Sequence, residues 1–180
     1  MTEVIERGRV SDETHDAAPV TFEAFVAATG ARLLRSAVLL TTDRHDAEDL
    51  VQTTYGLVFA RWRLVRQAND PVAYVRTMQL RAFLNDKRRK RVSTVPLLPD
   101  VDTDVVHDES GGNELRLSLL DALRSLPPQD RALLVLRYFE DLPVGVVADR
   151  LGMSEGACRT RASRALARLR TQFPDLDDED

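Results

Sequence analysis

Apolar side chains recur every three or four residues along most of this chain, which is the spacing of one face of an α-helix. Before residue 92 the pattern predicts three helices, namely about Thr21 to Leu40, Asp43 or Asp46 to about Trp62, and Pro71 into a run of basic residues. After residue 113 it predicts four more, namely Glu114 to Arg124, Pro127 or Pro128 to Phe139, Pro143 to Gly152, and a last one from Ser154 to Gln172. No segment alternates as a strand does, so we expect an all-α fold.

One stretch, from Val92 to Asn113, separates the two groups of helices. It combines Pro96, Pro99, Gly111 and Gly112 with five acidic residues and has no helical apolar pattern. We therefore predict two small helical domains joined by a flexible acidic linker. The expected division is a disordered extension (1–20), a first domain (21–92), the linker (93–113), a second domain (114–173) and an acidic tail (174–180).

The second domain contains a helix-turn-helix pattern from Val144 to Arg170, with Gly152 in the turn. Its apolar positions predict one inward face, made of Val147, Ala148, Leu151, Met153, Cys158, Ala162, Ala165, Leu166 and Leu169. The residues left for the outward face suit phosphate and base-edge contacts: Ser154, Glu155, Arg159, Thr160, Ser163 and Arg164, with Arg161 at its edge. Taken alone, the pattern also fits a solvated arginine-rich helix in a bundle.

The chain has 180 residues, of which 43% are hydrophobic and 30% charged, which is typical of a soluble folded protein. Its apolar runs fall short of the roughly 20 residues of a membrane span, and residues 1–19 lack the apolar core of a signal peptide. We expect a cytoplasmic protein with no membrane insertion. The single cysteine and three dispersed histidines offer no disulfide and no metal site, so we expect no cofactor.

The net charge of −4 conceals two strongly basic segments. Seven basic residues lie between Arg76 and Arg91 against one acid, and six arginines lie between Arg150 and Arg170 against Glu155. The acids gather in segments 100–109 and 175–180. This uneven distribution is compatible with nucleic-acid binding in spite of the negative total.

Two sets of motifs identify a resemblance that spans about residues 21 to 173. Leu126–Arg131, Leu136–Leu142 and Leu151–Gly156 closely resemble the C-terminal domain of bacterial RNA polymerase sigma factors of the extracytoplasmic-function class. Asp46–Gln52, followed by Phe59–Trp62, is similar to the polymerase-binding helix of that family. Pro71–Thr77, leading into Lys87–Arg91, is similar to its promoter-melting helix, and the order of the motifs is that of the family.

The resemblance implies a role for each basic or acidic surface. The polar patch Asp46, Glu48, Asp49 and Gln52 is implied to bind the clamp helices of the largest polymerase subunit, although periodicity alone would favour an ordinary exposed face. On the third helix we expect phosphate contacts from Arg76, Lys87, Arg88, Arg89 and Arg91, and base capture by Arg81 and Asn85. Many family members carry asparagine at the position of Arg81 and aspartate at that of Asn85, so their base preference does not transfer.

We therefore predict a sigma factor that directs core RNA polymerase to promoters and is not itself an enzyme. Its expected partners are core polymerase and promoter DNA, both duplex and melted, and an anti-sigma factor is left open. The alternative is a stand-alone helix-turn-helix regulator, which would bind operator DNA without polymerase and usually as a dimer. A hydrolase or transferase is disfavoured, because the sequence has no glycine-rich phosphate loop, nucleophile elbow or metal-binding histidine pair.

Overall fold

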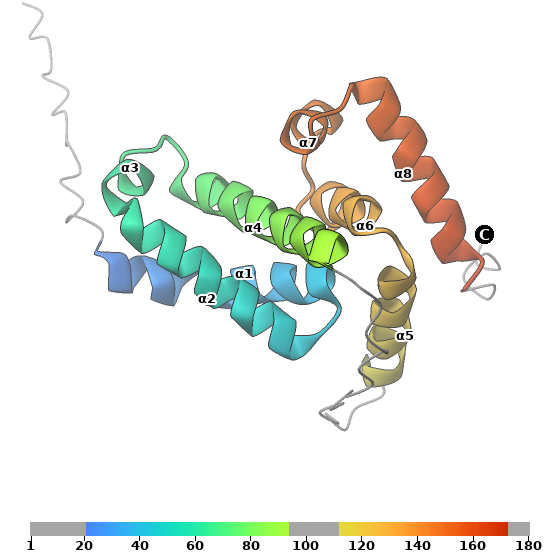
Figure 1. Cartoon of the computed structure of the whole chain (residues 1–180), viewed down its shortest axis with the longest axis horizontal. Coiled ribbons are helices and arrows are strands. Elements are labelled where there is room, and N and C mark those ends of the chain that lie inside the picture. The colour runs from blue at the N-terminus through green and yellow to red at the C-terminus, as the bar shows by residue number, and fades with distance from the viewer. Residues whose placement is uncertain (1–20, 94–111, 173–180) are drawn as a thin grey trace, which may run out of the picture.

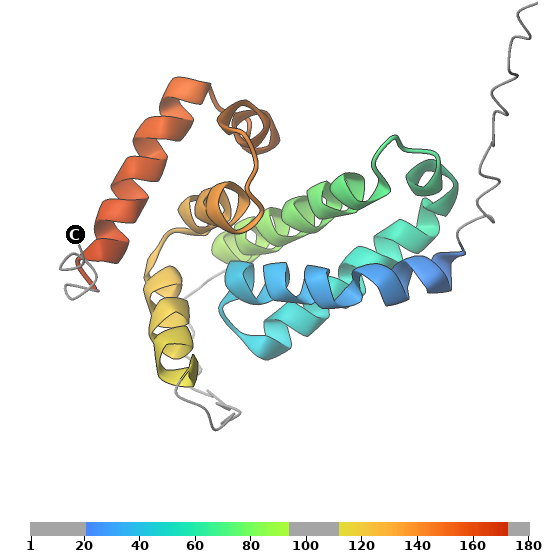
Figure 2. The same ribbon diagram turned by 180° about the vertical axis from the view of Figure 1, so that it is seen from behind.

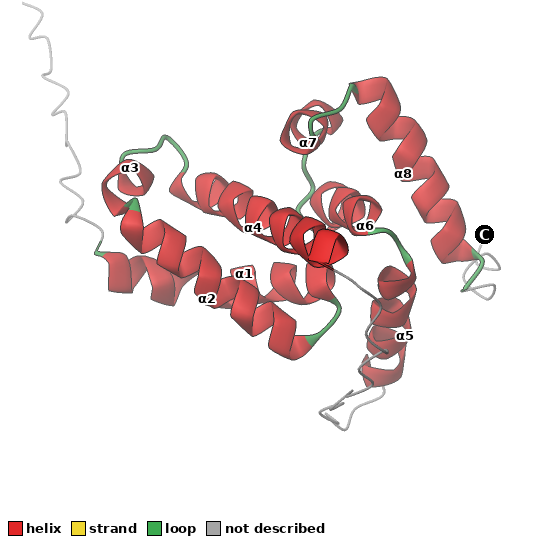
Figure 3. Cartoon of the chain, in the orientation of Figure 1, coloured by secondary structure: helices red, strands yellow, loops and turns green. Residues whose placement is uncertain are grey.

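The structure is a computed structural model that describes residues 21–93 and 112–172, and every regular element within these ranges is a helix (Figure 3). The first group contains α1 (Phe22–Thr41), α2 (Arg44–Ala60), α3 (Trp62–Arg66) and α4 (Pro71–Ser93). The second contains α5 (Gly112–Ser125), α6 (Pro128–Leu134), the π-helical turn η1 (Val135–Phe139), α7 (Val144–Leu151) and α8 (Glu155–Arg170) (Figure 1). The predicted extension, most of the linker and the tail lie outside the described residues.

Side-chain caps fix the starts of four helices at or beside the predicted positions. Each capping oxygen accepts the amide N–H three residues later, at 2.8–3.2 Å, and the caps are Thr21, Asp43, Asp70 and Ser154. Such caps satisfy amide groups that have no partner within the helix, so short polar residues define where the chain turns helical. Helix α5 begins at Gly112, two residues before the predicted start at Glu114.

Two predicted helices are interrupted in the structure. The second was expected to run to Trp62, but α2 ends at Ala60 and α3 begins at Trp62. The Trp62 ring packs against Phe22 and Phe25, at centroid distances of 5.6 and 5.4 Å, and this tertiary packing overrides helix continuation.

The helix expected from Pro128 to Phe139 is also not uniform. It changes from α to π geometry at Val135, where the amide N–H of Glu140 donates to the Val135 carbonyl at 3.0 Å, five residues earlier. A π turn leaves no signature in the apolar spacing, so the sequence did not reveal it.

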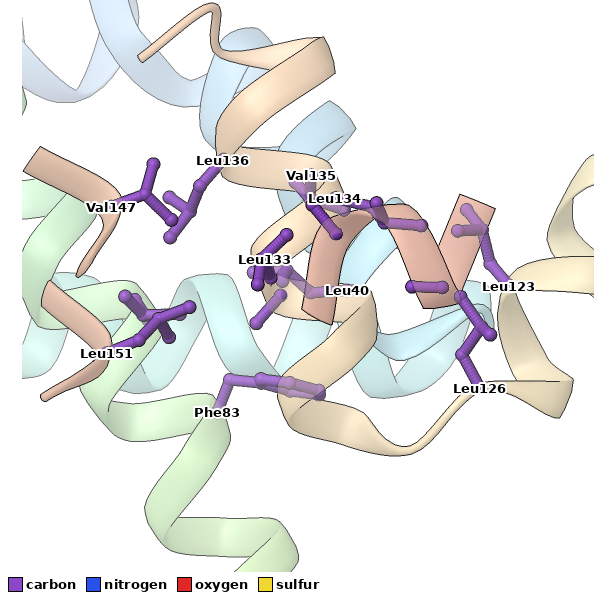
Figure 4. Close-up of a cluster of buried hydrophobic side chains, with 14 of the residues drawn as sticks. Leu40, Phe83, Leu123, Leu126, Leu133, Leu134, Val135, Leu136, Val147 and Leu151 are labelled. Atoms are coloured by element: carbon purple, nitrogen blue, oxygen red, sulfur yellow. The ribbon is translucent and has the colours of Figure 1, made fainter. Parts of the chain in front are cut away.

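The buried side chains form two clusters that do not divide at the linker. One lies wholly in the first group of helices and includes Phe25, Leu33 and Val58. The larger cluster combines residues of α1, α2 and α4 with residues of α5 to α8, and Figure 4 shows Leu40 and Phe83 beside Leu133. The two helical units therefore share a hydrophobic core.

Polar contacts reinforce this shared core through two side chains of the second unit. Arg131, which is buried, donates through Nη1 to the Leu40 carbonyl at 2.9 Å and through Nη2 to the Leu126 carbonyl at 3.2 Å. Burial, together with the charge of Arg124, lowers the pKa of Arg131 to about 10. Glu140 accepts a 2.8 Å hydrogen bond from Ser36 of α1, and burial raises the pKa of its carboxyl group.

Contrary to the expectation that the apolar runs are too short, helix α1 is long and apolar enough to cross a membrane by length and composition alone. In the structure it is a core helix that packs against α2 and α4. Leu33 and Ala37 are almost completely buried there, at 1% and 0% exposure. Its apolar character is accounted for by this packing, because a long core helix of a folded protein can be as apolar as a membrane span.

Candidate nucleic-acid interface

The helix-turn-helix is formed by α7, a turn at Gly152–Ser154 and α8, as the sequence predicted. Gly152 adopts a left-handed conformation with φ 66°, which is readily available to glycine and ends α7. The Met153 amide N–H then donates to the Ala148 carbonyl at 3.0 Å, and Ser154 caps α8. Local hydrogen bonds thus fix the angle at which α8 leaves the turn.

The predicted inward and outward faces of α8 are confirmed. Cys158, Ala162 and Ala165 are buried, and Leu166 and Leu169 pack against the shared core. The candidate contact residues are exposed: Ser154, Glu155, Arg159, Thr160, Ser163 and Arg164, with Arg161 half-buried. Helix α8 lies at the outer edge of the molecule in both views (Figure 1, Figure 2), where a duplex can approach it.

The four candidate polymerase-binding residues lie on α2, and three of them line a surface groove of about 590 Å³ between α2 and α4. Asp46, Asp49 and Gln52 line one side, and Asn85, Lys87 and Arg89 line the other. Lys87 Nζ and Asp46 Oδ2 lie 3.3 Å apart across it. Glu48 pairs instead with Arg44 of its own helix, at 2.5 Å. The structure therefore places two predicted surfaces, one for polymerase and one for DNA, on opposite walls of one groove.

The basic residues of α4 that are predicted to contact DNA do not all line this groove. Arg81, Arg88 and Arg89 are exposed, and Lys87 is half-buried by its pairing with Asp46. Arg91 lies in the last turn of α4. Arg76 lies apart from them, with only 10% of its side chain exposed and Nη1 3.8 Å from Glu140 Oε2. In this arrangement Arg76 faces the second helical unit.

Comparison with known proteins agrees with the fold. Residues 116–169 match the protein-family model described as sigma-70, region 4. The RNA polymerase sigma-E factor of Streptomyces avermitilis is 34% identical over 158 residues, which cover 87% of each chain. The ECF RNA polymerase sigma factor SigE of Mycolicibacterium smegmatis is 33% identical over 171 residues, covering 89% of this chain and 65% of that protein. The chain belongs to the extracytoplasmic-function class of RNA polymerase sigma factors.

Solved structures show the same fold for this sigma factor. The sigma factor RpoE of Bartonella quintana, crystallised with the anti-sigma factor NepR, superposes with a TM-score of 0.68 at 21% identity. The match covers 88% of this chain and 98% of that one. The region 4 match begins within α5 and ends within α8, so it contains the helix-turn-helix up to the last residue but one of α8.

Sequence reasoning missed one residue beside the predicted DNA-binding surface of α8. Asp130 of α6 forms an ion pair with Arg161 Nε, and its second oxygen lies 3.6 Å from Arg168 Nη1. Its side chain is only 10% exposed. A carboxylate inside a motif that otherwise predicts a helix start gave no sign of this partner, because Arg161 lies 31 residues further along the chain.

Proposed function

We propose that this chain binds core RNA polymerase, directs it to promoters and initiates transcription there, and that it has no catalytic activity of its own. The observation that carries the proposal is the coexistence of two different charged surfaces in one sigma-factor fold: an arginine-rich helix-turn-helix and an acid–base groove at α2 and α4. A stand-alone regulator needs only the first surface. Chromosomal DNA and polymerase also imply a cytoplasmic location.

The upstream promoter element is the proposed ligand of α8. Arginine can donate two parallel hydrogen bonds to a guanine edge, and serine, threonine and main-chain amides can hold phosphates. The exposed row Arg159, Ser163 and Arg164 supplies these groups on one helix. We assign base reading to Arg159 and phosphate contact to Arg168.

The acidic wall of the groove is the proposed site for a basic helix of the polymerase clamp. Asp49 and Gln52 are exposed and lie nearly one helical turn apart, which suits a partner helix that crosses α2. Asp46 already balances Lys87, so a basic partner would compete with Lys87 for the same carboxylate. Exposed charge pairs are weak in water, which favours such an exchange.

Promoter opening is assigned to α4. Arg88 and Arg89 offer exposed cations to the phosphate backbone of a separated strand. Arg81 and Asn85 lie one turn apart and are both exposed, so they can address the same unpaired base. On pre-melted bubble templates Arg81→Lys should lose base preference if the planar guanidinium captures a base, whereas a retained preference would assign Arg81 to phosphate alone.

Run-off transcription from a genomic fragment pool tests the whole proposal. Core polymerase with this chain should produce discrete transcripts that core polymerase alone does not. A set of duplexes bound equally well with and without polymerase, and giving no transcripts, would instead favour the stand-alone regulator. An anti-sigma factor stays an expectation, to be tested by adding candidate proteins to the same reaction.

A further inference from the structure

Asp130 connects the support helix α6 to two arginines of α8. Its Oδ1 accepts a hydrogen bond from Arg161 Nε, and its Oδ2 lies 3.6 Å from Arg168 Nη1. The carboxylate is 10% exposed, whereas the side chains of Arg161 and Arg168 are 38% and 60% exposed. A nearly buried acid therefore holds two cations that reach towards solvent.

Helix α6, which carries Asp130, is anchored by hydrogen bonds of the neighbouring residue. The next residue, Arg131, is buried and donates hydrogen bonds to main-chain carbonyls of Leu40, Thr41, Arg124 and Leu126. The Asp130 amide N–H donates to the Pro127 carbonyl at 2.9 Å. Asp130 thus lies on a buried, hydrogen-bonded support, from which it contacts α8.

The contact with Asp130 leaves the two terminal nitrogens of Arg161 available to a ligand. Asp130 engages Nε, and the edge formed by the two terminal nitrogens can still donate two hydrogen bonds to a base edge or a phosphate. Around this pair, α8 and Asp130 line a surface depression of about 490 Å³, with Thr160, Arg164 and Arg168 beside it. Three arginines against one carboxylate favour an anionic ligand there.

A second acid on the same surface provides an internal contrast. Glu155 pairs with Arg159 at 2.6 Å, but both belong to α8 and both are more than half exposed, at 51% and 63%. Such a pair is open to solvent and easily rearranged. Among the ion pairs of residues 21–93 and 112–172, only those of Asp130 connect arginines of α8 to a different, buried element.

We propose that Asp130 is a positioning residue for DNA recognition: it holds Arg161 and Arg168 in the orientation that α8 presents to the upstream promoter duplex. This inference rests on the proposed function, in which α8 binds that duplex. A preoriented arginine loses less side-chain freedom on binding and accepts fewer alternative geometries. Because Arg168 is assigned to phosphate, it is through Arg161, at the edge of the outward face, that Asp130 affects how well the protein distinguishes its own sequence from other DNA.

The proposal is testable because the negative charge of Asp130 and its positioning of the arginines have opposite effects on DNA binding. A carboxylate near DNA repels phosphates, so if charge were all that mattered, Asp130→Asn would strengthen binding to every duplex alike. Positioning predicts instead that the preferred duplex gains less than other duplexes, or loses affinity. The informative quantity is the ratio of the two affinities, not either affinity alone.

The experiment uses the holoenzyme, the upstream duplex selected by the wild type, and a base-shuffled duplex of equal length. We expect Asp130→Asn to lower the affinity ratio about three- to tenfold. The matched control is Asp149→Asn, which removes the same charge from an exposed position of α7 and should leave the ratio unchanged. In an Arg161→Ala, Arg168→Ala background, Asp130→Asn should change the ratio no further.

A ratio for Asp130→Asn equal to that of Asp149→Asn would overturn the inference, as would an equal loss with and without the two arginines. Arg161→Lys keeps the charge but lacks the planar fork, so it should reproduce the loss without disturbing α6. An undiminished ratio in Arg161→Lys would also overturn the inference. If the wild type selects no duplex at all, the proposed function itself fails.

Discussion

The two basic surfaces of this sigma factor are balanced by acids in opposite ways. On α4, Lys87 faces Asp46 across an open groove, and their side chains are 25% and 40% exposed. On α8, Arg161 and Arg168 face Asp130, which is 10% exposed and belongs to a buried support. The first acid is open to competition from a partner, whereas the second is fixed. If the proposed roles hold, a polymerase helix that displaces Lys87 from Asp46 would free a cation for the separated strand, whereas the arginines of α8 are already oriented within the protein.

The largest expected effect comes from removing the core that supports both surfaces. Leu133 is fully buried at the junction of the two units, with 0% exposure, so Leu133→Ala should lower the free energy of unfolding by about 2 to 5 kcal/mol. Chemical denaturation measures this change. Leu115→Ala, at a position 62% exposed, is the control and should alter stability little. A loss below about 1 kcal/mol for Leu133→Ala would contradict the shared core.

The next largest effect is expected at the groove between α2 and α4, where a basic partner is proposed to displace Lys87 from Asp46. Glu48→Lys combined with Asp49→Lys places two cations where a basic clamp helix is proposed to bind, and like charges at an interface cost several kcal/mol. The affinity for core polymerase should fall at least tenfold while the helical circular dichroism signal stays intact. Glu23→Lys, on exposed α1 surface, should bind normally. Unchanged affinity of the double variant in a pull-down would remove α2 from the interface.

A smaller effect on DNA affinity is expected from α8, at a single base position of the promoter. If Arg159 reads a base edge, Arg159→Ala should cost roughly 1 to 3 kcal/mol and relax the preference at one promoter position. Arg168→Ala should weaken all sequences alike, because a phosphate contact carries no sequence information. A promoter library measured with each variant separates these outcomes. Identical preference profiles for the wild type and Arg159→Ala would exclude base reading by Arg159.

The smallest effect tests whether the groove pair restrains Lys87. Asp46→Asn releases Lys87, so binding of the free chain to single-stranded DNA at low salt should tighten by less than about 1 kcal/mol. The gain should disappear at high salt, where exposed charges are screened. Glu23→Gln removes the same charge from a distant exposed site and is the matched control. Equal binding by Asp46→Asn and this control would mean that Lys87 is not restrained in the free chain.

Local patterns predicted most of the fold. Caps at Thr21, Asp43 and Ser154 lie beside the helices that they begin, and the left-handed turn at Gly152 ends α7, so a few neighbouring residues determine each boundary. The apolar stripe of α8 was predicted for the same reason. Helical periodicity also separated the residues of α8 that face the core from those that face solvent.

Contacts between distant residues could not be predicted in this way. The pairing of Arg76 with Glu140, 64 positions later in the chain, was not foreseen, and the expected contact of Arg76 with DNA stays a prediction. Asp130 was recognised only as part of a motif, although it holds two arginines of α8. The break at Arg61 and the shared core likewise depend on which helices pack together, and a single sequence does not reveal those neighbours.

The π turn η1 has a consequence for how the two units are oriented. An extra residue in one turn shifts everything after it by one position, or by about 100° around the helix axis. Deleting one residue between Val135 and Phe139 would restore an α turn, move Glu140 away from Ser36 and rotate α7 and α8 with it. The orientation of the helix-turn-helix, formed by α7 and α8, thus depends on the number of residues in the single turn η1.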